Sequence, residues 1–302
     1  MNKFKQGALL GTLSGASWGL NTIIIGFILT LSIFLSYSEN IFISALVIAF
    51  LHDFFSSIWL ILNLIRLREI KEFFYCFKNK KCIYFLIFSS ILGGPVGMAG
   101  YLLGVNYIGP SCAASFSALY PALGTILTAI LLLEILWLSY TPVNLKQYPY
   151  YYLGMLFCFV CVLGWALECV VASYAMKYGE ISPSIAITLR QITSAVFYAI
   201  FIIPKIGGYL LVKEIFITNI FIYICLTALI GSLSYLFWYK SIDLIGAPRG
   251  MSLNITYVIW TILFEKLFFN TQLDIRFIGA SLVIVIGIIF IAGNPKELMS
   301  TN

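Results

Sequence analysis

The sequence predicts an all-α, polytopic membrane protein with nine to ten transmembrane helices in two repeated halves. Of its 302 residues, 61% are hydrophobic and only 10% are charged, and the mean hydropathy is +1.00. Soluble domains carry about 25% charged residues. Apolar runs of about 20 residues, long enough to cross a bilayer, recur from one end to the other. Finally, three pairs of short motifs occur in the same order in both halves.

The apolar runs and the polar breaks between them give nine expected spans. The stretch 66–82 carries six Lys or Arg residues, which predicts that this loop, and with it the N-terminus, is cytoplasmic. The protein is therefore expected to be a multi-pass protein of the cytoplasmic membrane. The expected spans are residues 7–35, 41–66, 83–107, 110–138, 150–176, 181–203, 215–240, 245–269 and 274–293.

The internal repeat divides the chain into halves 1–149 and 150–302. The paired motifs are ASWGLNT with GWALECV, LHDFFSS with LRQITSA, and IGPSCAASFSALYP with IGAPRGMSLNITYV. Secondary transporters commonly have such repeats, with the substrate site near mid-membrane between them. The motifs place in register Trp18 with Trp165, Asn21 with Glu168, His52 with Arg190, Asp53 with Gln191, Gly109 with Gly246, and Tyr120 with Tyr257.

The chain also resembles a known family. The link YIGPSCAASFSALYPAL, Glu134 thirteen residues after Pro121, and the duplicated layout resemble the EamA type of the drug/metabolite transporter superfamily. The motifs SGASWGL, LHDFFS, GGPVGMAGYLLGVNYIG, SALYPA, LRQITS and LNITYVIWT resemble its bacterial choline-importing branch. This resemblance implies a secondary transporter of ten spans, five in each of two inverted halves.

The middle of the chain departs from that family. The segment between Glu134 and Tyr150 is polar, and at about 1.5 Å per residue it is shorter than the ~30 Å bilayer core. The fifth helix is therefore short or missing, or residues 110–149 fold unusually. A missing helix would put the inverted symmetry and transport itself in question.

Several aromatic and ionisable residues lie near the centres of the expected spans. A charge at the centre of a span costs about 2.5–3.5 kcal/mol, so such groups need a cavity or one another. These residues are Trp18, His52, Asp53, Tyr120, Trp165, Glu168, Arg190 and Tyr257, and the amides Asn21 and Gln191 complete the set of candidate site residues.

These residues suggest an aromatic cage for an organic cation. Trp165 and Glu168 are three residues apart and share a helix face, as do Trp18 and Asn21 in the other half. With Tyr120 and Tyr257 they would surround a quaternary ammonium such as choline, which is recognised by aromatic faces. Glu168 would supply the counter-charge. Alternatively, each tryptophan fills a helix interface and Glu168 ties helices together.

The position of Arg190 decides which of two kinds of substrate is expected, and pairing with Asp53 is the first choice. If it pairs with Asp53, Glu168 stays free for a cation, although the Asp53–Arg190 pair could also be a purely structural strut. If Arg190 faces the cavity, the substrate carries a carboxylate, and an exporter of amino acids or other small metabolites is the better reading. His52 and Gln191 lie about 100° around their helices from these partners. A proton-linked role for His52, Asp53 or Glu168 stays open.

The remaining patterns favour packing and exclude other classes. Pro95 is expected to bend the third span near the cavity. The glycines at 7, 11, 15 and 19 predict close helix packing. No phosphate-binding loop, metal-ligand cluster or nucleophile–base set occurs, so no cofactor, metal, enzymatic activity or nucleic-acid partner is expected. A membrane enzyme and a non-transporting receptor are the other classes of protein considered. The expected partners are a choline-like small molecule and the lipid bilayer, and the protein could act as a monomer. Trp59, Trp137 and Trp238 are expected as interfacial anchors, and Tyr101, Tyr235, Asn254 and Trp260 as secondary cavity residues.

Overall fold

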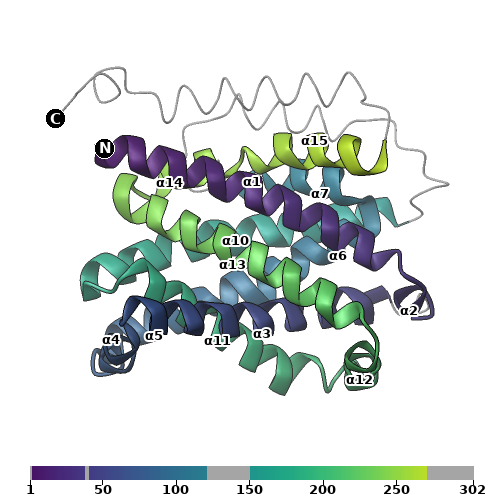
Figure 1. The fold of residues 1–302 in the computed structure, drawn as a ribbon, viewed down its shortest axis with the longest axis horizontal. Coiled ribbons are helices and arrows are strands. Elements are labelled where there is room, and N and C mark those ends of the chain that lie inside the picture. The colour runs from purple at the N-terminus through teal and green to yellow at the C-terminus, as the bar shows by residue number, and fades with distance from the viewer. Residues whose placement is uncertain (1, 38–40, 121–149, 271–302) are drawn as a thin grey trace.

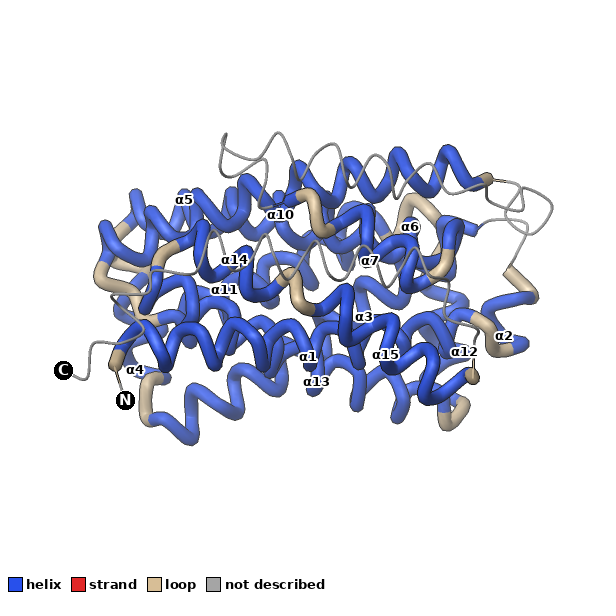
Figure 2. Tube along the Cα trace, turned by 90° about the horizontal axis from the view of Figure 1, so that it is seen from above, coloured by secondary structure: helices blue, strands red, loops and turns tan. Residues whose placement is uncertain are grey.

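The computed structural model of the chain describes residues 2–37, 41–120 and 150–270. Across these ranges the regular elements are helices joined by short loops (Figures 1 and 2). Seven segments are long and apolar enough to cross a membrane. The predicted fold class, a polytopic all-α membrane protein, is therefore confirmed. The spanning segments are α1 (Lys3–Leu29), α3 (Ile41–Leu67), α5–η2–α6 (Lys80–Ile91, Leu92–Met98, Ala99–Ile108), α10 (Tyr151–Gly179), α11–η3 (Pro183–Phe197, Tyr198–Ile202), α13 (Ile220–Ile245) and α14–α15 (Ala247–Asn254, Tyr257–Phe269).

Three span boundaries differ from the sequence prediction. The first span ends at Leu29, and α2 (Ser32–Leu35) follows as a separate turn because Leu31 is extended. The span expected over 215–240 begins at Ile220, since the extended Thr218 separates it from α12 (Tyr209–Ile217). The span expected over 245–269 is broken into α14 and α15. The span expected over 274–293 and the question of the fifth helix lie outside the described residues.

Helix starts follow local sequence signals. Asn2 and Asn79 each accept a backbone N–H of the first turn, at 3.0 and 3.3 Å, at the beginnings of α1 and α5. Ser182 does the same for α11, where Pro183 occupies the first turn. Both arrangements satisfy backbone donors that have no partner within the helix.

The glycine ladder of α1 packs as the sequence predicted. A Cβ added to Gly15 would lie 2.2 Å from Thr256 Oγ1, and one added to Gly19 would lie 2.8 Å from Trp260 Cβ. The first helix of one half therefore lies almost backbone to backbone against α14 and α15 of the other half. Small residues permit this approach, which fixes the two halves side by side.

Matching helices of the two sequence halves run in opposite directions. The start of α1 lies beside the end of α13, where Ser241 Oγ donates to the carbonyl of Gly7 at 2.8 Å. Lys3, at the start of α1, and Lys177, near the end of α10, line one surface hollow. The end of α6 and the start of α10 meet at the opposite end, where the Tyr107 and Tyr150 rings are 5.9 Å apart. Helices α1 and α10 are thus antiparallel, which is the arrangement of an inverted repeat.

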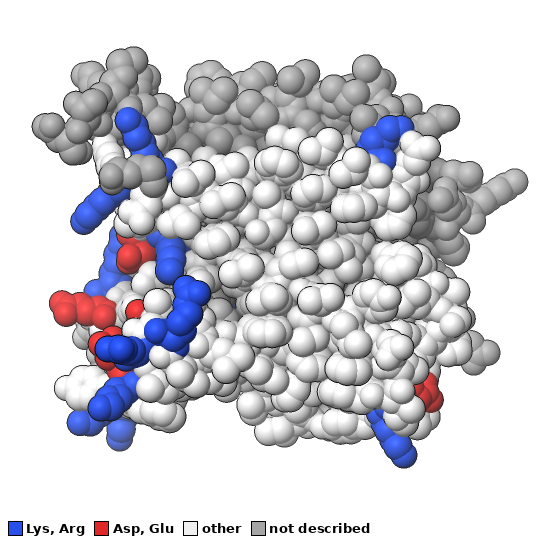
Figure 3. All heavy atoms as spheres, in the orientation of Figure 1, with Lys and Arg blue, Asp and Glu red and all other residues white. Residues whose placement is uncertain are grey.

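Basic residues gather at one end of the molecule (Figure 3). This end includes α4 (Ile70–Cys76) and the starts of α1 and α5. The positive-inside rule assigns it to the cytoplasm. The basic residues at this end are Lys3, Lys5, Arg66, Arg68, Lys71, Lys78, Lys80, Lys81, Lys177, Lys240 and Arg249, against Lys205, Lys213 and Lys266 at the other.

Two short helices, α7 (Pro110–Ser117) and α14, have the same construction. Each has eight residues and a proline in its first turn, and each follows a glycine with a positive φ. Gly109 has φ/ψ of 80°/162° and Gly246 has 88°/158°. Each helix ends in a two-residue turn before Tyr120 or Tyr257. The paired motifs thus fold alike, and broken helices of this kind build substrate sites in transporters.

Gly246→Ala is expected to destabilise the protein by about 1–3 kcal/mol, because the backbone region it occupies is nearly restricted to glycine. An added Cβ would meet no atom within 4 Å, so the loss would come from the backbone alone. Thermal unfolding of the purified variant measures the effect. Ala247→Gly, at the first helical residue, is the control and should change stability much less. Equal stability of Gly246→Ala and wild type would contradict the strain argument.

Candidate functional site

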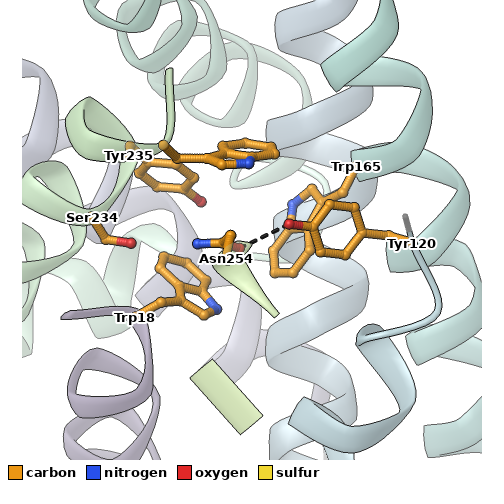
Figure 4. A pocket seen from close by; sticks show the side chains of 7 residues that line it. Trp18, Tyr120, Trp165, Ser234, Tyr235 and Asn254 are labelled. Carbon is orange, nitrogen blue, oxygen red and sulfur yellow. Dashed lines mark hydrogen bonds between the residues drawn. The ribbon is translucent and has the colours of Figure 1, made fainter. Parts of the chain in front are cut away.

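An aromatic cavity lies where α1, α10 and α13 meet the two broken helices (Figure 4). It has a volume of about 10 Å³, which is room for about one water molecule. None of the described residues lining it is charged. They are Trp18, Tyr120, Trp165, Ser234, Tyr235, Trp238 and Asn254.

The tryptophans that the repeat pairs, Trp18 and Trp165, meet in this cavity. Their rings are 5.6 Å apart and nearly perpendicular. Tyr235 lies 5.0 Å from Trp18, and Tyr120 lies 5.9 Å from Trp165. Tyr101 contacts both tryptophans, at 5.7 and 5.0 Å, and donates or accepts a hydrogen bond with Thr22 at 2.7 Å. The two halves therefore contribute their aromatic faces to one place, as the sequence suggested.

The two paired tyrosines make reciprocal hydrogen bonds between the broken helices. Tyr120 donates to Asn254 Oδ1 at 2.8 Å, at the end of α14. Tyr257 and Ser117, at the end of α7, are bonded at 2.6 Å. Ser117 and Asn254 occupy matching positions of the repeat. Tyr257 is fully buried but does not line the cavity, whereas Tyr120 does.

Arg190 lies at the centre of a buried ionic cluster beside the cavity. Its Nε donates to Glu168 Oε1 at 3.0 Å, and its Nη1 lies 3.5 Å from Asp53 Oδ2. Its Nη1 also donates to Gln191 Oε1 at 2.5 Å. Arg190 therefore pairs with Asp53, which was the first choice of partner, but it also pairs with Glu168, so the expectation that Glu168 stays free was wrong. A guanidinium has five donors in a planar fork, so it can bind both carboxylates at once.

The rest of the cluster comes from α3 and α13. His52 Nδ1 lies 3.3 Å from Asp53 Oδ1, so these neighbours interact directly. Tyr239 donates to Glu168 Oε1 at 2.9 Å. Two carboxylates face one guanidinium, so the cluster carries a formal charge of −1 when both carboxylates are ionised and His52 is neutral. All of these groups are buried, so this negative charge lies inside the bundle.

Asn21, the repeat partner of Glu168, lies apart from the ion pairs. Its side chain is fully buried and has no hydrogen-bond partner among the described residues. A Cβ added to Gly231 would lie 3.4 Å from Asn21 Oδ1 and 2.3 Å from His52 Nε2. Asn21 and His52 therefore adjoin the same helix face of α13, and neither lines the aromatic cavity.

A wide helical turn joins the cluster to the cavity. The segment Leu92–Met98 contains Pro95 and is a π-helix, the kind of irregularity at which helices bend. The predicted bend of the third span itself stays a prediction. The carbonyl of Gly93 accepts Trp165 Nε1 at 3.2 Å. A Cβ on Gly93 would lie 1.8 Å from Glu168 Oε2. One glycine thus contacts both the cavity wall and the carboxylate.

Tyr235 separates the cavity from the positive charge. The Arg190 guanidinium carbon lies 4.6 Å from the centre of the Tyr235 ring, while Trp18 contacts the same ring and lines the cavity. Glu168 is one turn from Trp165 on α10 but is not among the lining residues. The charges therefore act on the cavity from behind its aromatic wall.

Two lining residues were missed by the sequence analysis. Trp238 was expected as an interfacial anchor, but it is buried and lines the cavity. That prediction was wrong because the span was placed about five residues too early, which put Trp238 near its end. Ser234 carried no signal, since buried serines are common in membrane helices. Tyr235 and Asn254, named as secondary residues, line the cavity, whereas Trp260 stacks on Phe264 outside it.

Trp59, another expected anchor, does not line the cavity. Trp59 donates from Nε1 to the carbonyl of Cys225 at 3.2 Å, linking α3 to α13. Trp137 lies outside the described residues. Among residues 2–37, 41–120 and 150–270, no group of three or more His, Cys, Asp or Glu side chains could hold a metal ion.

Comparisons with known proteins agree with the fold and the motifs. Residues 152–293 match the model of the EamA-like transporter family. The chain is also 30% identical over 199 residues to protein LicB of Haemophilus influenzae. That match covers 58% of this chain and 63% of LicB, which is less than two thirds of the length of that relative. Residues 152–293 are thus similar to the EamA-like transporter family, which is also the family that the sequence motifs resemble.

Proposed function

We propose that this protein is a secondary transporter that moves a small quaternary ammonium, such as choline, across the membrane by alternating access. The observation that carries the proposal is the uncharged aromatic cavity between the inverted halves. A quaternary ammonium has no N–H to donate, so aromatic faces are its natural partners. Of the described residues that line the cavity, five are aromatic, and three of these are tryptophan.

The surrounding electrostatics favour a cation. The cluster of Asp53, Glu168 and Arg190 has an excess negative charge and lies directly behind the aromatic wall. Because the bundle interior has a low dielectric constant, this charge acts over a longer distance than it would in water. Glu168 therefore supports cation binding through the field of the cluster rather than as a direct contact.

The position of Arg190 argues against an amino-acid substrate. The carboxylate of an amino acid would need a positive partner inside the cavity. Arg190 is the nearest such group, but Tyr235 covers it and Glu168 and Asp53 already bind it. An exporter of amino acids is for this reason the less favoured alternative.

The broken helices support alternating access. The cavity holds about one water molecule, so a larger cation requires the rings to separate. The reciprocal bonds of Tyr120 and Tyr257 join the broken helices at this point. Movement of one half against the other would therefore open the cavity and change these bonds together.

Binding of choline to the purified protein tests the proposal. Trp165→Ala is expected to raise the Kd about tenfold, because it removes a ring that contacts the cation, and a desolvated cation–π contact stabilises by up to about 2 kcal/mol. Trp260→Ala is the matched control, since Trp260 does not line the cavity, and its Kd should equal that of wild type. Calorimetry gives both values.

Transport is then measured as uptake of labelled choline into proteoliposomes. The proposal predicts saturable uptake by wild type and reduced uptake by Trp165→Ala at low choline concentration. A folded wild-type protein that neither binds nor takes up choline, betaine or tetramethylammonium would overturn the proposal.

A further inference from the structure

One corner of the aromatic cavity is polar and uncharged. Asn254 and Ser234 line the cavity there, and Ser14 lies behind them. Figure 4 shows the Asn254 amide between the rings of Trp18 and Tyr235, with its oxygen toward Tyr120 and its nitrogen on the side of Ser234. A purely aromatic cage has no need of these groups, so their hydrogen-bonding capacity indicates what else the site binds.

The bonds within this corner leave one donor and one acceptor for a ligand. Asn254 Oδ1 accepts from Tyr120, and Asn254 Nδ2 donates to Ser14 Oγ at 2.7 Å. An amide nitrogen carries two hydrogens, so one remains. Ser234 Oγ donates its hydrogen to the Ser14 carbonyl at 2.8 Å and lies 3.1 Å from Ser14 Oγ. One lone pair of Ser234 Oγ therefore remains to accept a further hydrogen bond.

We infer that this corner binds the hydroxyl group of the substrate, with Asn254 Nδ2 donating to the hydroxyl oxygen and Ser234 Oγ accepting its hydrogen. The inference rests on the proposed function, and it narrows the substrate class to quaternary ammonium alcohols. A hydroxyl group has one hydrogen to donate and lone pairs to accept, which matches what Asn254 and Ser234 offer.

Other head groups fit this corner less well. A carboxylate only accepts hydrogen bonds, so it would meet the lone pairs of Ser234 and would bring an unpaired charge into the cavity. A methyl group would leave both the Asn254 donor and the Ser234 acceptor without partners, which costs free energy in a buried site. Sites built to hydrogen-bond a hydroxyl group therefore discriminate against analogues that lack it.

The test compares four ligands by calorimetry on the purified full-length protein. Choline carries the hydroxyl group, and propyltrimethylammonium has a methyl group in its place. Betaine carries a carboxylate, and tetramethylammonium has only the cationic head. Wild type is expected to bind choline about tenfold more tightly than propyltrimethylammonium, corresponding to two neutral hydrogen bonds. Betaine is expected to bind more weakly than both choline and propyltrimethylammonium.

Two variants locate the discrimination. Ser234→Ala and Asn254→Ala each remove one of the two hydrogen bonds to choline, so each should lower the affinity ratio of choline to propyltrimethylammonium from about ten to about three. Ser232→Ala and Ser252→Ala are the matched controls on the same helices. Their hydroxyls donate to Leu229 and Pro248 carbonyls and do not line the cavity, so they should keep the wild-type ratio.

The outcomes separate this inference from the proposed function. Equal affinity of wild type for choline and propyltrimethylammonium would overturn the hydroxyl site and leave the cation cage intact. A wild-type ratio that persists in Ser234→Ala and Asn254→Ala would also overturn it. Absence of binding by all four ligands would instead overturn the proposed function, and this inference with it. Even if a variant fails to fold, the affinities of wild type for choline and propyltrimethylammonium still test the hydroxyl site.

Discussion

An Arg190→Met variant is expected to lose about 3–5 kcal/mol of folding stability, because removing one partner of a buried ion pair leaves the opposite charge uncompensated. Here the loss would leave two buried carboxylates, Asp53 and Glu168, without the guanidinium that neutralises them. Methionine approximates the length of the apolar part of arginine, so the cavity left behind is small. Thermal unfolding in detergent, followed by size-exclusion chromatography, measures the change.

A second variant distinguishes charge from packing. Adding Asp53→Asn and Glu168→Gln to Arg190→Met removes all three charges and should restore most of the lost stability. Lys213→Met, a basic residue on α12 outside the spans, serves as the single-substitution control and should behave as wild type. If Arg190→Met unfolds at the same temperature as this control, the cluster does not contribute to stability as described.

Gly93→Ala is expected to disrupt the carboxylate and the aromatic cavity together. The added methyl would lie 1.8 Å from Glu168 Oε2 and 2.0 Å from its Cδ. The Glu168 side chain must then move, which strains its bonds to Arg190 and Tyr239. We expect about 1–3 kcal/mol of destabilisation from overpacking and at least tenfold weaker choline binding, measured by unfolding and calorimetry.

Two further variants make this expectation specific. Gly26→Ala adds a methyl to α1 whose closest neighbour is Pro110 Cγ at 3.1 Å, far less severe than the contact at Gly93. It should leave choline binding unchanged. Glu168→Asp shortens the side chain by one methylene and should partly restore the binding lost in Gly93→Ala. Wild-type affinity of Gly93→Ala would show that the carboxylate need not hold this position.

Hydropathy and the internal repeat predicted the main features of the fold. Helices need a long apolar run to cross a bilayer, and such runs are visible without tertiary information. The breaks were not predicted, because the turns before Tyr120 and Tyr257 lie within continuous apolar stretches. The paired glycines at 109 and 246 were aligned correctly, yet their common positive φ emerged only from the structure.

The candidate site was predicted in part. The repeat located Trp18, Trp165 and Tyr120, since aromatic residues at matching central positions face a shared interface. The repeat could not predict which carboxylates Arg190 contacts. The rotamer of the long arginine side chain and the rotation of its helix decide this, and neither can be derived from the sequence motifs. The same limitation hid Trp238 and Ser234, whose helix α13 begins five residues later than its hydropathy suggests.

The reciprocal tyrosine bonds bear on the resting occupancy of the transport states. In a chain of inverted halves, exchanging their conformations converts a state open on one side into one open on the other. In that exchange, the hydrogen bond of Tyr120 takes the geometry that the bond of Tyr257 had, and the reverse. If the two halves were identical, the two states would have equal free energy and equal populations. The repeat is not identical here, since one tyrosine bonds the amide of Asn254 and the other the hydroxyl of Ser117. In the proposed alternating-access cycle, this difference between the halves would favour one of the two states of the empty protein over the other.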